Sequence, residues 1–262
     1  MAAPYFIDSF DGTPLAVWRS GPQGAPPVLL SHYLGGSAEG WEPVARALEH
    51  RFRVVRYDTR GHGASGAPHG PYTIDMLGRD ALAVIAGLGL GKTHVVGVSQ
   101  GGMAAMWLGA RQPEAVDRLV LANTAPFIPN KPVWDENIAR ARAEGMDDIA
   151  AQTIGSWLSE AFKREHPQQM ARLVETMQRM PVEGYAGCAA VLRDVDLRED
   201  LGRIEAPALV IAGAEDGPRG AAAAAIAGAV QHGRLVTLPK AAHLSHIENP
   251  PAFAAAVLEH LA

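Results

Sequence analysis

The sequence predicts an α/β fold: a mostly parallel sheet of eight strands with helices on both faces, interrupted by one inserted helical segment. Three observations support this prediction. Short β-branched apolar runs alternate with helix-forming runs through the first half of the chain, which is typical of a parallel sheet covered on both faces. The alternation stops near residue 125 and resumes near residue 207. One strand-to-helix transition carries the pattern Gly-x-Ser-x-Gly.

The elements before the interruption follow in order. Residues 5–10 and 15–19 flank the turn Asp11-Gly12-Thr13-Pro14, which predicts an antiparallel hairpin at one edge of the sheet. Thr73 is the expected N-cap of a long helix. The remaining apolar runs predict strands over 28–31, 52–57, 93–98 and 118–122, with helices over 38–48, 74–90 and 103–111.

From residue 129 to about 198 the pattern is helical and offers no convincing strand. This stretch is too long for a loop, so we expect a helical cap over 126–198 inserted into a core formed by 1–125 and 199–262. The cap carries Trp134 and Trp157, which we expect to close over a substrate. After it, the core resumes with strands over 207–212 and 234–238 and helices over 219–229 and 251–261.

Composition narrows the class of protein. The chain has 262 residues, 48% of them hydrophobic, and a formal net charge of −5. It therefore offers no basic surface for nucleic acid or anionic lipid. No apolar run approaches the ~20 residues of a membrane span, and residues 1–8 lack the pattern of a signal peptide. The single cysteine, Cys188, cannot form an internal disulfide, so we expect a small buried residue and a reducing, cytoplasmic compartment.

Ser99 is the candidate nucleophile. It lies in Gly97-Val98-Ser99-Gln100-Gly101, between an expected strand and an expected helix. The flanking glycines permit a turn too tight for a Cβ, and such a turn lifts the hydroxyl above the sheet. The helix N-terminus behind it favours developing negative charge. The five-residue pattern alone is weak in a chain with 28 glycines, so the prediction depends on the strand before it and the helix after it.

A serine hydroxyl needs a base, and the base needs an acid that orients it. On this topology the acid and then the base follow the serine along the chain. The turn after the next-to-last strand offers Asp216, with Glu215 as the alternative, whereas the earlier turn offers only Asn123, which carries no charge. The loop after the last strand offers His243, with His246 as its competitor. We expect Asp216 and His243 to complete the site.

The oxyanion formed during acyl transfer needs two backbone N–H donors. Gln100, the residue after the nucleophile, is the first candidate. Leu34, in the loop His32-Tyr33-Leu34-Gly35-Gly36, is the second. Tyr33 occupies a position where glycine is usual, and its side chain therefore affects the geometry of this loop.

No cofactor and no metal are expected. Asp58 and His62 lie four residues apart in a glycine-rich turn but lack a third ligand at a useful spacing. A structural loop is the simpler interpretation, and we expect His32 and His62 to hold local structure. No phosphate loop or dinucleotide fingerprint stands in the required strand-to-helix context.

Beyond these motifs, the chain resembles the α/β-hydrolases, and among them the 3-oxoadipate enol-lactonases, over nearly its whole length. The resemblance rests on segments 52–63, 70–74, 119–125, 184–188, 193–198 and 242–245. It implies the α/β-hydrolase fold and a lactonase of aromatic-compound catabolism, in the β-ketoadipate pathway. It also implies that the family's nucleophile, acid and base fall on Ser99, Asp216 and His243.

The sequence departs from that family around the expected pocket. Gln100 stands where the enol-lactonases usually carry Met, and His32-Tyr33 replaces smaller residues. Asn137 occupies a position where related sequences often place a basic residue. Gly217-Pro218-Arg219 follows the acid in place of an Ala/Thr-Pro pattern. These changes affect the expected substrate more than the expected fold.

A substrate carboxylate needs a cation, because an unpaired buried charge carries a large desolvation cost. The cations left in the first part of the cap are Lys131, Arg140 and Arg142. We expect Tyr33, Trp134 and Arg140 to contact the substrate, and we expect weak selectivity for a carboxylate. Small neutral lactones and esters are then substrates as well.

The sequence therefore indicates a cofactor-free serine hydrolase whose partner is a small lactone or ester. A general short-chain carboxylesterase, or a perhydrolase using the same acyl-enzyme, is the alternative within enzymes. A ligand receptor that kept the fold and lost turnover is the alternative outside them, and the complete Ser-Asp-His set argues against it. Neither nucleic acid nor a membrane is expected as a partner, and the sequence leaves the oligomeric state open.

Overall fold

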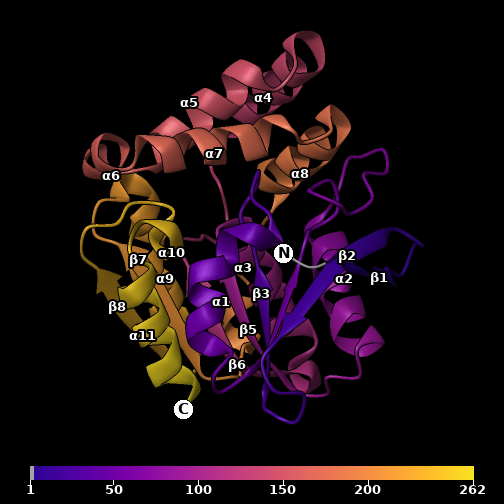
Figure 1. Cartoon of the computed structure of the whole chain (residues 1–262), viewed down its shortest axis with the longest axis vertical. Coiled ribbons are helices and arrows are strands. Elements are labelled where there is room, and N and C mark those ends of the chain that lie inside the picture. Colours follow the sequence, from indigo (N-terminus) through magenta and orange to yellow (C-terminus); the bar gives the residue numbers. More distant parts are fainter. Residues whose placement is uncertain (1–2) are drawn as a thin grey trace.

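The computed structural model describes residues 3–262, so residues 1–2 of the expected core lie outside the described residues. An eight-stranded sheet runs through it in the order β1-β2-β4-β3-β5-β6-β7-β8 (Figure 1). The β1–β2 and β2–β4 pairs are antiparallel and the others are parallel, which confirms the edge hairpin and the mostly parallel sheet. The strands are β1 (Tyr5–Asp8), β2 (Pro14–Ser20), β3 (Pro27–Ser31), β4 (Arg53–Tyr57), β5 (Thr93–Val98), β6 (Val116–Ala122), β7 (Ala208–Gly213) and β8 (Gly233–Leu238).

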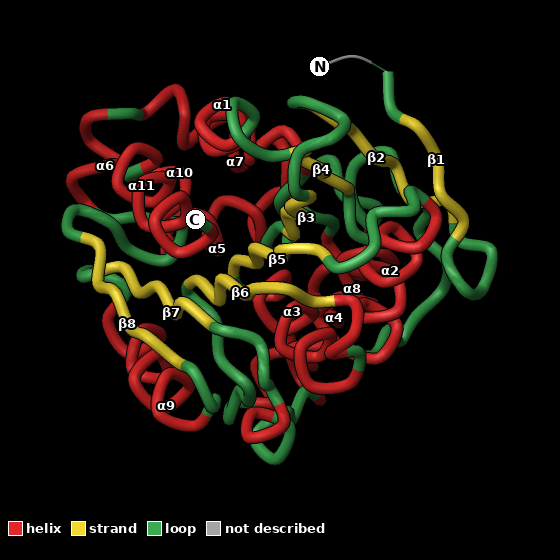
Figure 2. The backbone as a smooth tube through the Cα atoms, turned by 90° about the horizontal axis from the view of Figure 1, so that it is seen from below, coloured by secondary structure: helices red, strands yellow, loops and turns green. Residues whose placement is uncertain are grey.

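Helices cover both faces of the sheet (Figure 2). On one face α1 (Glu42–Leu48) lies beside α11 (Pro250–Leu261). The other face carries α2 (Ile74–Gly87), α3 (Gln100–Arg111) and α9 (Ala222–Ala229). The inner strands β5 and β7 are buried along their whole length, as expected for parallel strands between two helical layers.

All five helices expected in the core differ by one to four residues at one end, and for two of them the reason is identifiable. The helix expected over 38–48 begins as a 3₁₀ turn and becomes α-helical only at Glu42. Pro43 lacks the N–H that an unbroken α-helix would direct at Glu39. The helix expected over 74–90 ends at Gly87, because Gly89 adopts φ +58° and closes a Schellman motif. In that motif the Leu90 N–H donates to the Ile85 carbonyl at 3.1 Å.

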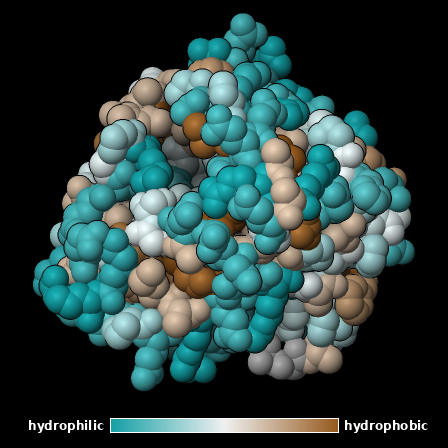
Figure 3. All heavy atoms as spheres, turned by 90° about the horizontal axis from the view of Figure 1, so that it is seen from above, coloured by the Kyte–Doolittle hydropathy of each residue, from teal (hydrophilic) through white to brown (hydrophobic). Residues whose placement is uncertain are grey.

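Five helices lie above the carboxyl ends of the strands, between β6 and β7 in the chain (Figure 1). This helical segment begins and ends near one antiparallel bridge, which pairs Phe127 with Asp196. Seen from above, the molecule presents a largely hydrophilic surface (Figure 3). The helices are α4 (Lys131–Glu144), α5 (Asp147–Trp157), α6 (Glu160–Glu165), α7 (Pro167–Gln178) and α8 (Val182–Asp194).

The helical segment lies where the sequence predicts a cap, and its division from the core into a separate unit stays a prediction. A further short helix, α10 (Ser245–Glu248), follows the loop after β8. None of the helices in residues 3–262 combines the length and the apolarity that crossing a bilayer requires.

Candidate active site

Ser99 lies on the turn between β5 and α3 in a backbone conformation that residues with a Cβ rarely adopt. Its φ is 55° and its ψ is −117°. The glycines beside it have no room for side chains. A Cβ on Gly97 would lie 2.2 Å from the Gly101 carbonyl oxygen, and one on Gly101 would lie 2.2 Å from the Ser31 carbonyl oxygen. The turn therefore presents Ser99 at the N-terminus of α3, where the helix dipole favours negative charge.

The structure brings the three expected side chains together. His243 Nε2 lies 3.1 Å from Ser99 Oγ. On the other side of the ring, His243 Nδ1 lies 3.1 Å from one carboxylate oxygen of Asp216 and 3.2 Å from the other. All three residues are buried, so the imidazole and the carboxylate interact in a medium of low dielectric constant. This arrangement can transfer the hydroxyl proton to the imidazole.

The two alternatives considered in the sequence lie elsewhere. Glu215 is exposed. His246 is fully buried against Trp41 and Phe253, with ring centroids 4.6 Å and 6.0 Å away. Neither of its ring nitrogens has a hydrogen-bond partner within residues 3–262. Burial, together with the nearby His243, lowers the pKa of His246 to about 3, so this imidazole is neutral at physiological pH.

Asn123 holds the acid in place, a role the sequence reasoning missed. Its Nδ2 donates to Asp216 Oδ2 at 2.9 Å and to the Ala242 carbonyl at 3.0 Å. Its Oδ1 accepts from the hydroxyl of Ser245. Asn123 has φ 45° at the end of β6, a conformation that asparagine tolerates better than most residues. The signal available in the sequence was its position in the turn after that strand.

The base is also tied to the helical segment. The backbone N–H of His243 donates to the Trp157 carbonyl at the end of α5, at 3.0 Å. The Trp157 ring packs against the imidazole with centroids 5.2 Å apart. One residue of α5 therefore fixes both the backbone and the ring of His243.

The two expected oxyanion donors, Leu34 and Gln100, lie in the loop after β3 and at the first residue of α3. Within residues 3–262, neither backbone N–H donates to another protein group, so both are available to a ligand. The Gln100 side chain donates to the Cys188 carbonyl of α8 at 2.9 Å. Gln100, which differs from the enol-lactonase pattern, thus connects the turn after β5 to α8 of the helical segment. Cys188 itself is buried, and burial raises its thiol pKa.

Two buried histidines shape the loop that carries Leu34. The Gly35 N–H donates to His62 Nε2 at 2.9 Å, and the Thr59 N–H donates to His32 Nε2 at 3.0 Å. Each ring uses one nitrogen as an acceptor and is therefore neutral in this arrangement. Burial lowers the pKa of both rings, in agreement with that state. The two carboxylate oxygens of Asp58 accept hydrogen bonds from the backbone N–H groups of Ala38 and Ala64.

A cavity of about 370 Å³ opens beside Ser99 and His243. Its wall is mostly apolar, which suits a small organic substrate and excludes water from the reacting atoms. Trp134 and Trp157 both line it, as the sequence predicts for the cap. The apolar part of the wall comes from both the core and the helical segment, through Met103, Phe127, Ile128, Trp134, Trp157 and Leu192.

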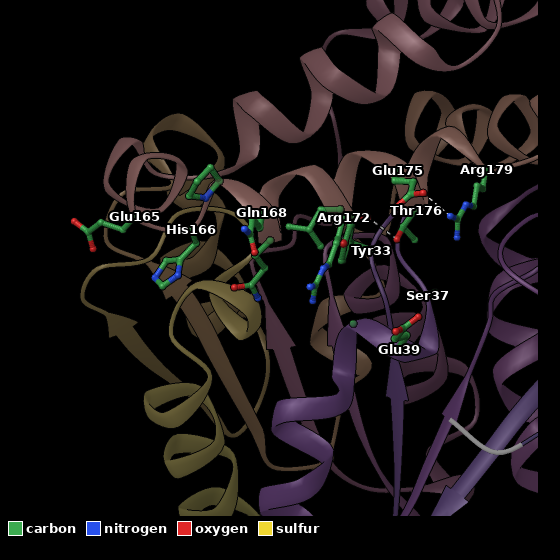
Figure 4. Close-up of a pocket in the computed structure, with 14 residues that line it drawn as sticks. Tyr33, Ser37, Glu39, Glu165, His166, Gln168, Arg172, Glu175, Thr176 and Arg179 are labelled. Atoms are coloured by element: carbon green, nitrogen blue, oxygen red, sulfur yellow. Dashed lines mark hydrogen bonds and ion pairs between the residues drawn. The ribbon is translucent and has the colours of Figure 1, made fainter.

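The other two expected substrate contacts lie outside this wall. Tyr33 lines a second, larger cavity of about 770 Å³ between α7 and the loop before α1, where Ser37 and Glu39 face Arg172 and Thr176 (Figure 4). Its ring is held by an edge-to-face contact with Trp157, with centroids 5.9 Å apart.

The cap cations named from the sequence do not line the catalytic cavity either. Arg140 lies 3.6 Å from Glu144 on its own helix. Lys131 and Arg142 lie 3.7 Å from Asp194 and 2.9 Å from Glu183. Arg219 lines the cavity instead. Its signal in the sequence was the unusual segment after Asp216. Among residues 3–262, no group of three or more His, Cys, Asp or Glu side chains could hold a metal ion.

Several known proteins are similar to this chain over most of its length. The 3-oxoadipate enol-lactonase 2 of Acinetobacter baylyi is 34% identical over 88% of this chain and 87% of its own length. The crystal structure of the enol-lactonase from Burkholderia xenovorans LB400 superposes with a TM-score of 0.94 and 35% identity, covering 98% of this chain and 99% of that one. RutD of Caulobacter sp. strain K31, to which a carbamate hydrolase activity is assigned by inference, is 32% identical over 89% of this chain and 90% of its own.

A family profile gives the same assignment. Residues 26–250 match the profile described as the alpha/beta hydrolase fold. That range includes every strand from β3 to β8 and the whole set Ser99, Asp216 and His243. Because the match spans most of the chain, and the relatives are covered over nearly their whole lengths, this protein belongs to the α/β hydrolase family.

Proposed function

We propose that this α/β hydrolase cleaves a small lactone or ester through an acyl-enzyme on Ser99, in the manner of an enol-lactonase. The single observation that supports this most directly is the hydrogen-bonded series from Ser99 Oγ to His243 Nε2 and from His243 Nδ1 to Asp216, at 3.1 Å for each step. The strained turn at Ser99 and the apolar cavity beside it support the same function. No cofactor enters the proposed reaction.

In the first half of the reaction Ser99 Oγ attacks the substrate carbonyl carbon and His243 Nε2 takes the hydroxyl proton. The carbonyl oxygen becomes an oxyanion that the Leu34 and Gln100 N–H groups bind. Asp216 fixes the ring tautomer and stabilises the imidazolium. When the carbon–oxygen bond of the lactone or ester breaks, His243 gives its proton to the leaving oxygen, and the acyl group remains on Ser99.

In the second half His243 takes a proton from a water molecule, which attacks the acyl carbon. The bond to Ser99 Oγ breaks, Oγ regains a proton from His243, and the carboxylic acid leaves. Trp134 and Trp157 supply an apolar wall over the acyl group, which keeps other water away from it.

The enol-lactonase relatives favour a lactone as substrate, and the RutD relative keeps a carbamate as the second candidate. The two differ at the reacting carbonyl, which carries a carbon chain in a lactone and a nitrogen in a carbamate. A cavity wall with few polar side chains favours the lactone, since the N–H groups of a carbamate need hydrogen-bond acceptors. A cytoplasmic location stays a prediction from the sequence, and the oligomeric state stays open.

The test combines labelling with a substrate comparison. A fluorophosphonate should add one adduct to the intact protein, and the adduct should be absent in Ser99→Ala. The substitution should lower kcat for 4-nitrophenyl acetate by about 10⁴- to 10⁶-fold while the melting temperature stays near wild type. Next, kcat/KM is compared for 3-oxoadipate enol-lactone, 4-nitrophenyl acetate and methyl carbamate. Labelling at another residue, or carbamate as the best substrate, contradicts the proposal.

A further inference from the structure

We propose that Arg219 is a carboxylate-binding site in the catalytic cavity, so that this enzyme prefers lactones and esters that carry a carboxylate apart from the reacting carbonyl. The inference rests on the proposed function for its substrate class. It replaces the expectation of weak carboxylate selectivity, which was based on the cations of the cap.

Arg219 reaches the cavity from the turn that also carries the acid. It follows Asp216 by three residues in a short 3₁₀ helix, Gly217–Ala221. Gly217 adopts φ +58° at the start of this turn. Arg219 and its neighbour Pro218 line the same cavity as Ser99 and His243. A ligand in that cavity therefore lies beside both the nucleophile and Arg219.

Two hydrogen bonds to neutral acceptors hold the guanidinium. Arg219 Nη1 donates to the Ser156 carbonyl at 3.2 Å, and Nη2 donates to the Ser156 hydroxyl at 3.3 Å. Ser156 lies in the last turn of α5, where carbonyl groups lack helical partners and attract a cation. The next carbonyl, that of Trp157, accepts from the backbone of His243. The end of α5 thus anchors both the cation and the catalytic base.

The charge of Arg219 is not neutralised by the protein. No carboxylate of residues 3–262 lies within ion-pair distance of it, whereas Lys131, Arg140 and Arg142 of the helical segment each have one. Arginine has five N–H donors, of which Ser156 uses two, so three remain for a ligand. The planar guanidinium matches a carboxylate in a bidentate arrangement.

Arg219 is a charged residue in a cavity wall that is otherwise mostly apolar. Trp134, Leu192 and their neighbours form an apolar wall, and no Asp or Glu among residues 3–262 lines the cavity. A cation in an otherwise apolar cavity wall favours a ligand that combines an apolar part with an anionic group. The ligand class is accordingly a small acyl compound whose carboxylate is separated from its ester or lactone carbonyl by a short carbon chain.

Matched substrates test the proposal by turnover. The probes are the mono-4-nitrophenyl esters of succinate, glutarate and adipate, each compared with its methyl-esterified counterpart. We expect kcat/KM of the wild type to favour the best hemiester by about tenfold, the lower end for a charge-assisted pair because Arg219 is exposed. Arg219→Gln should bring the ratio close to one. Arg219→Lys should keep part of the preference.

Arg140→Gln is the matched control, because it removes a half-exposed cation that lies outside the cavity. It should leave the ratio unchanged. Equal ratios in the wild type and Arg219→Gln overturn the inference, and so does an equal loss in Arg140→Gln. In either case, neutral-ester turnover that depends on Ser99 still supports the proposed function.

A binding measurement separates the inference from catalysis. In Ser99→Ala, the intrinsic tryptophan fluorescence, to which Trp134 and Trp157 of the cavity wall contribute, reports ligand binding without turnover. Monomethyl glutarate should bind about tenfold more tightly than dimethyl glutarate, and the double variant with Arg219→Gln should lose that difference. If no ester is hydrolysed but this difference is present, the proposed function fails and the carboxylate site stands. Equal binding of the two ligands overturns the site.

Discussion

Asn123 offers a sharp test of how the catalytic acid is held. Replacing it by alanine removes the amide that donates to Asp216 at 2.9 Å and to the Ala242 carbonyl at 3.0 Å. Apart from His243, Asn123 is the hydrogen-bond donor to the Asp216 carboxylate within residues 3–262. Without it, the carboxylate can turn about its side-chain bonds and orient the imidazole less well.

The expected loss of kcat follows from the one hydrogen bond to Asp216 that the substitution removes. One hydrogen bond to a charged group contributes ~1.5–3 kcal/mol. If that whole amount is lost from the transition state, kcat falls by roughly 10- to 150-fold. The upper limit is the roughly 10⁴-fold loss expected when the carboxylate itself is replaced by an amide. We therefore expect Asn123→Ala to lower kcat by roughly 10- to 150-fold and to leave KM for a neutral ester nearly unchanged.

The matched control is Ser245→Ala. Ser245 is fully buried and donates to the Oδ1 of Asn123, on the side away from Asp216. Its removal should cost comparable stability, about 1–3 kcal/mol, because it leaves one buried acceptor unpaired. The amide donated to Asp216 remains, so kcat should change by less than about threefold.

The assay is steady-state hydrolysis of 4-nitrophenyl acetate, with urea unfolding of each variant in parallel. Two results would refute the reasoning. In one, kcat of Asn123→Ala stays within about threefold of wild type. In the other, Ser245→Ala loses as much kcat as Asn123→Ala, which would show that both act through general destabilisation of the site.

Two further predictions follow from the same residues. Asp216→Asn should lower kcat by roughly 10⁴-fold because the amide favours the wrong tautomer of His243, whereas the exposed Glu215→Gln should change it only slightly; the reverse order in steady-state kinetics means that the acid is misassigned. Because the pKa of His246 falls to about 3 in the folded protein, the unfolded chain binds a proton below pH ~6.5 that the native state does not, and stability falls as the pH drops. His246→Phe should therefore reduce the loss of unfolding free energy between pH 7.5 and 5.5 by about 1.4 kcal/mol in urea titrations, and an unchanged loss contradicts this.

The sequence by itself determined the order and type of the elements and the turn at Ser99. The alternation of β-branched and helix-forming runs is a local pattern, and it indicates which faces of the elements become buried. The glycines around Ser99 record a close backbone approach, since a Cβ at Gly97 or Gly101 would overlap a carbonyl oxygen. Because acid and base follow particular strands in this topology, chain order was enough to indicate Asp216 and His243.

Only the tertiary structure decided which side chains face the cavity. Ser99 and His243 are 144 residues apart, and the partners of Asn123 lie 93 to 122 residues away. Periodicity shows which face of a helix is buried but not what that face meets. Arg140 is half-exposed and Arg219 is exposed, yet the orientation of α4 pairs the first with Glu144, and the turn after β7 places the second in the cavity wall. That difference depends on the packing of distant segments, which no local pattern contains.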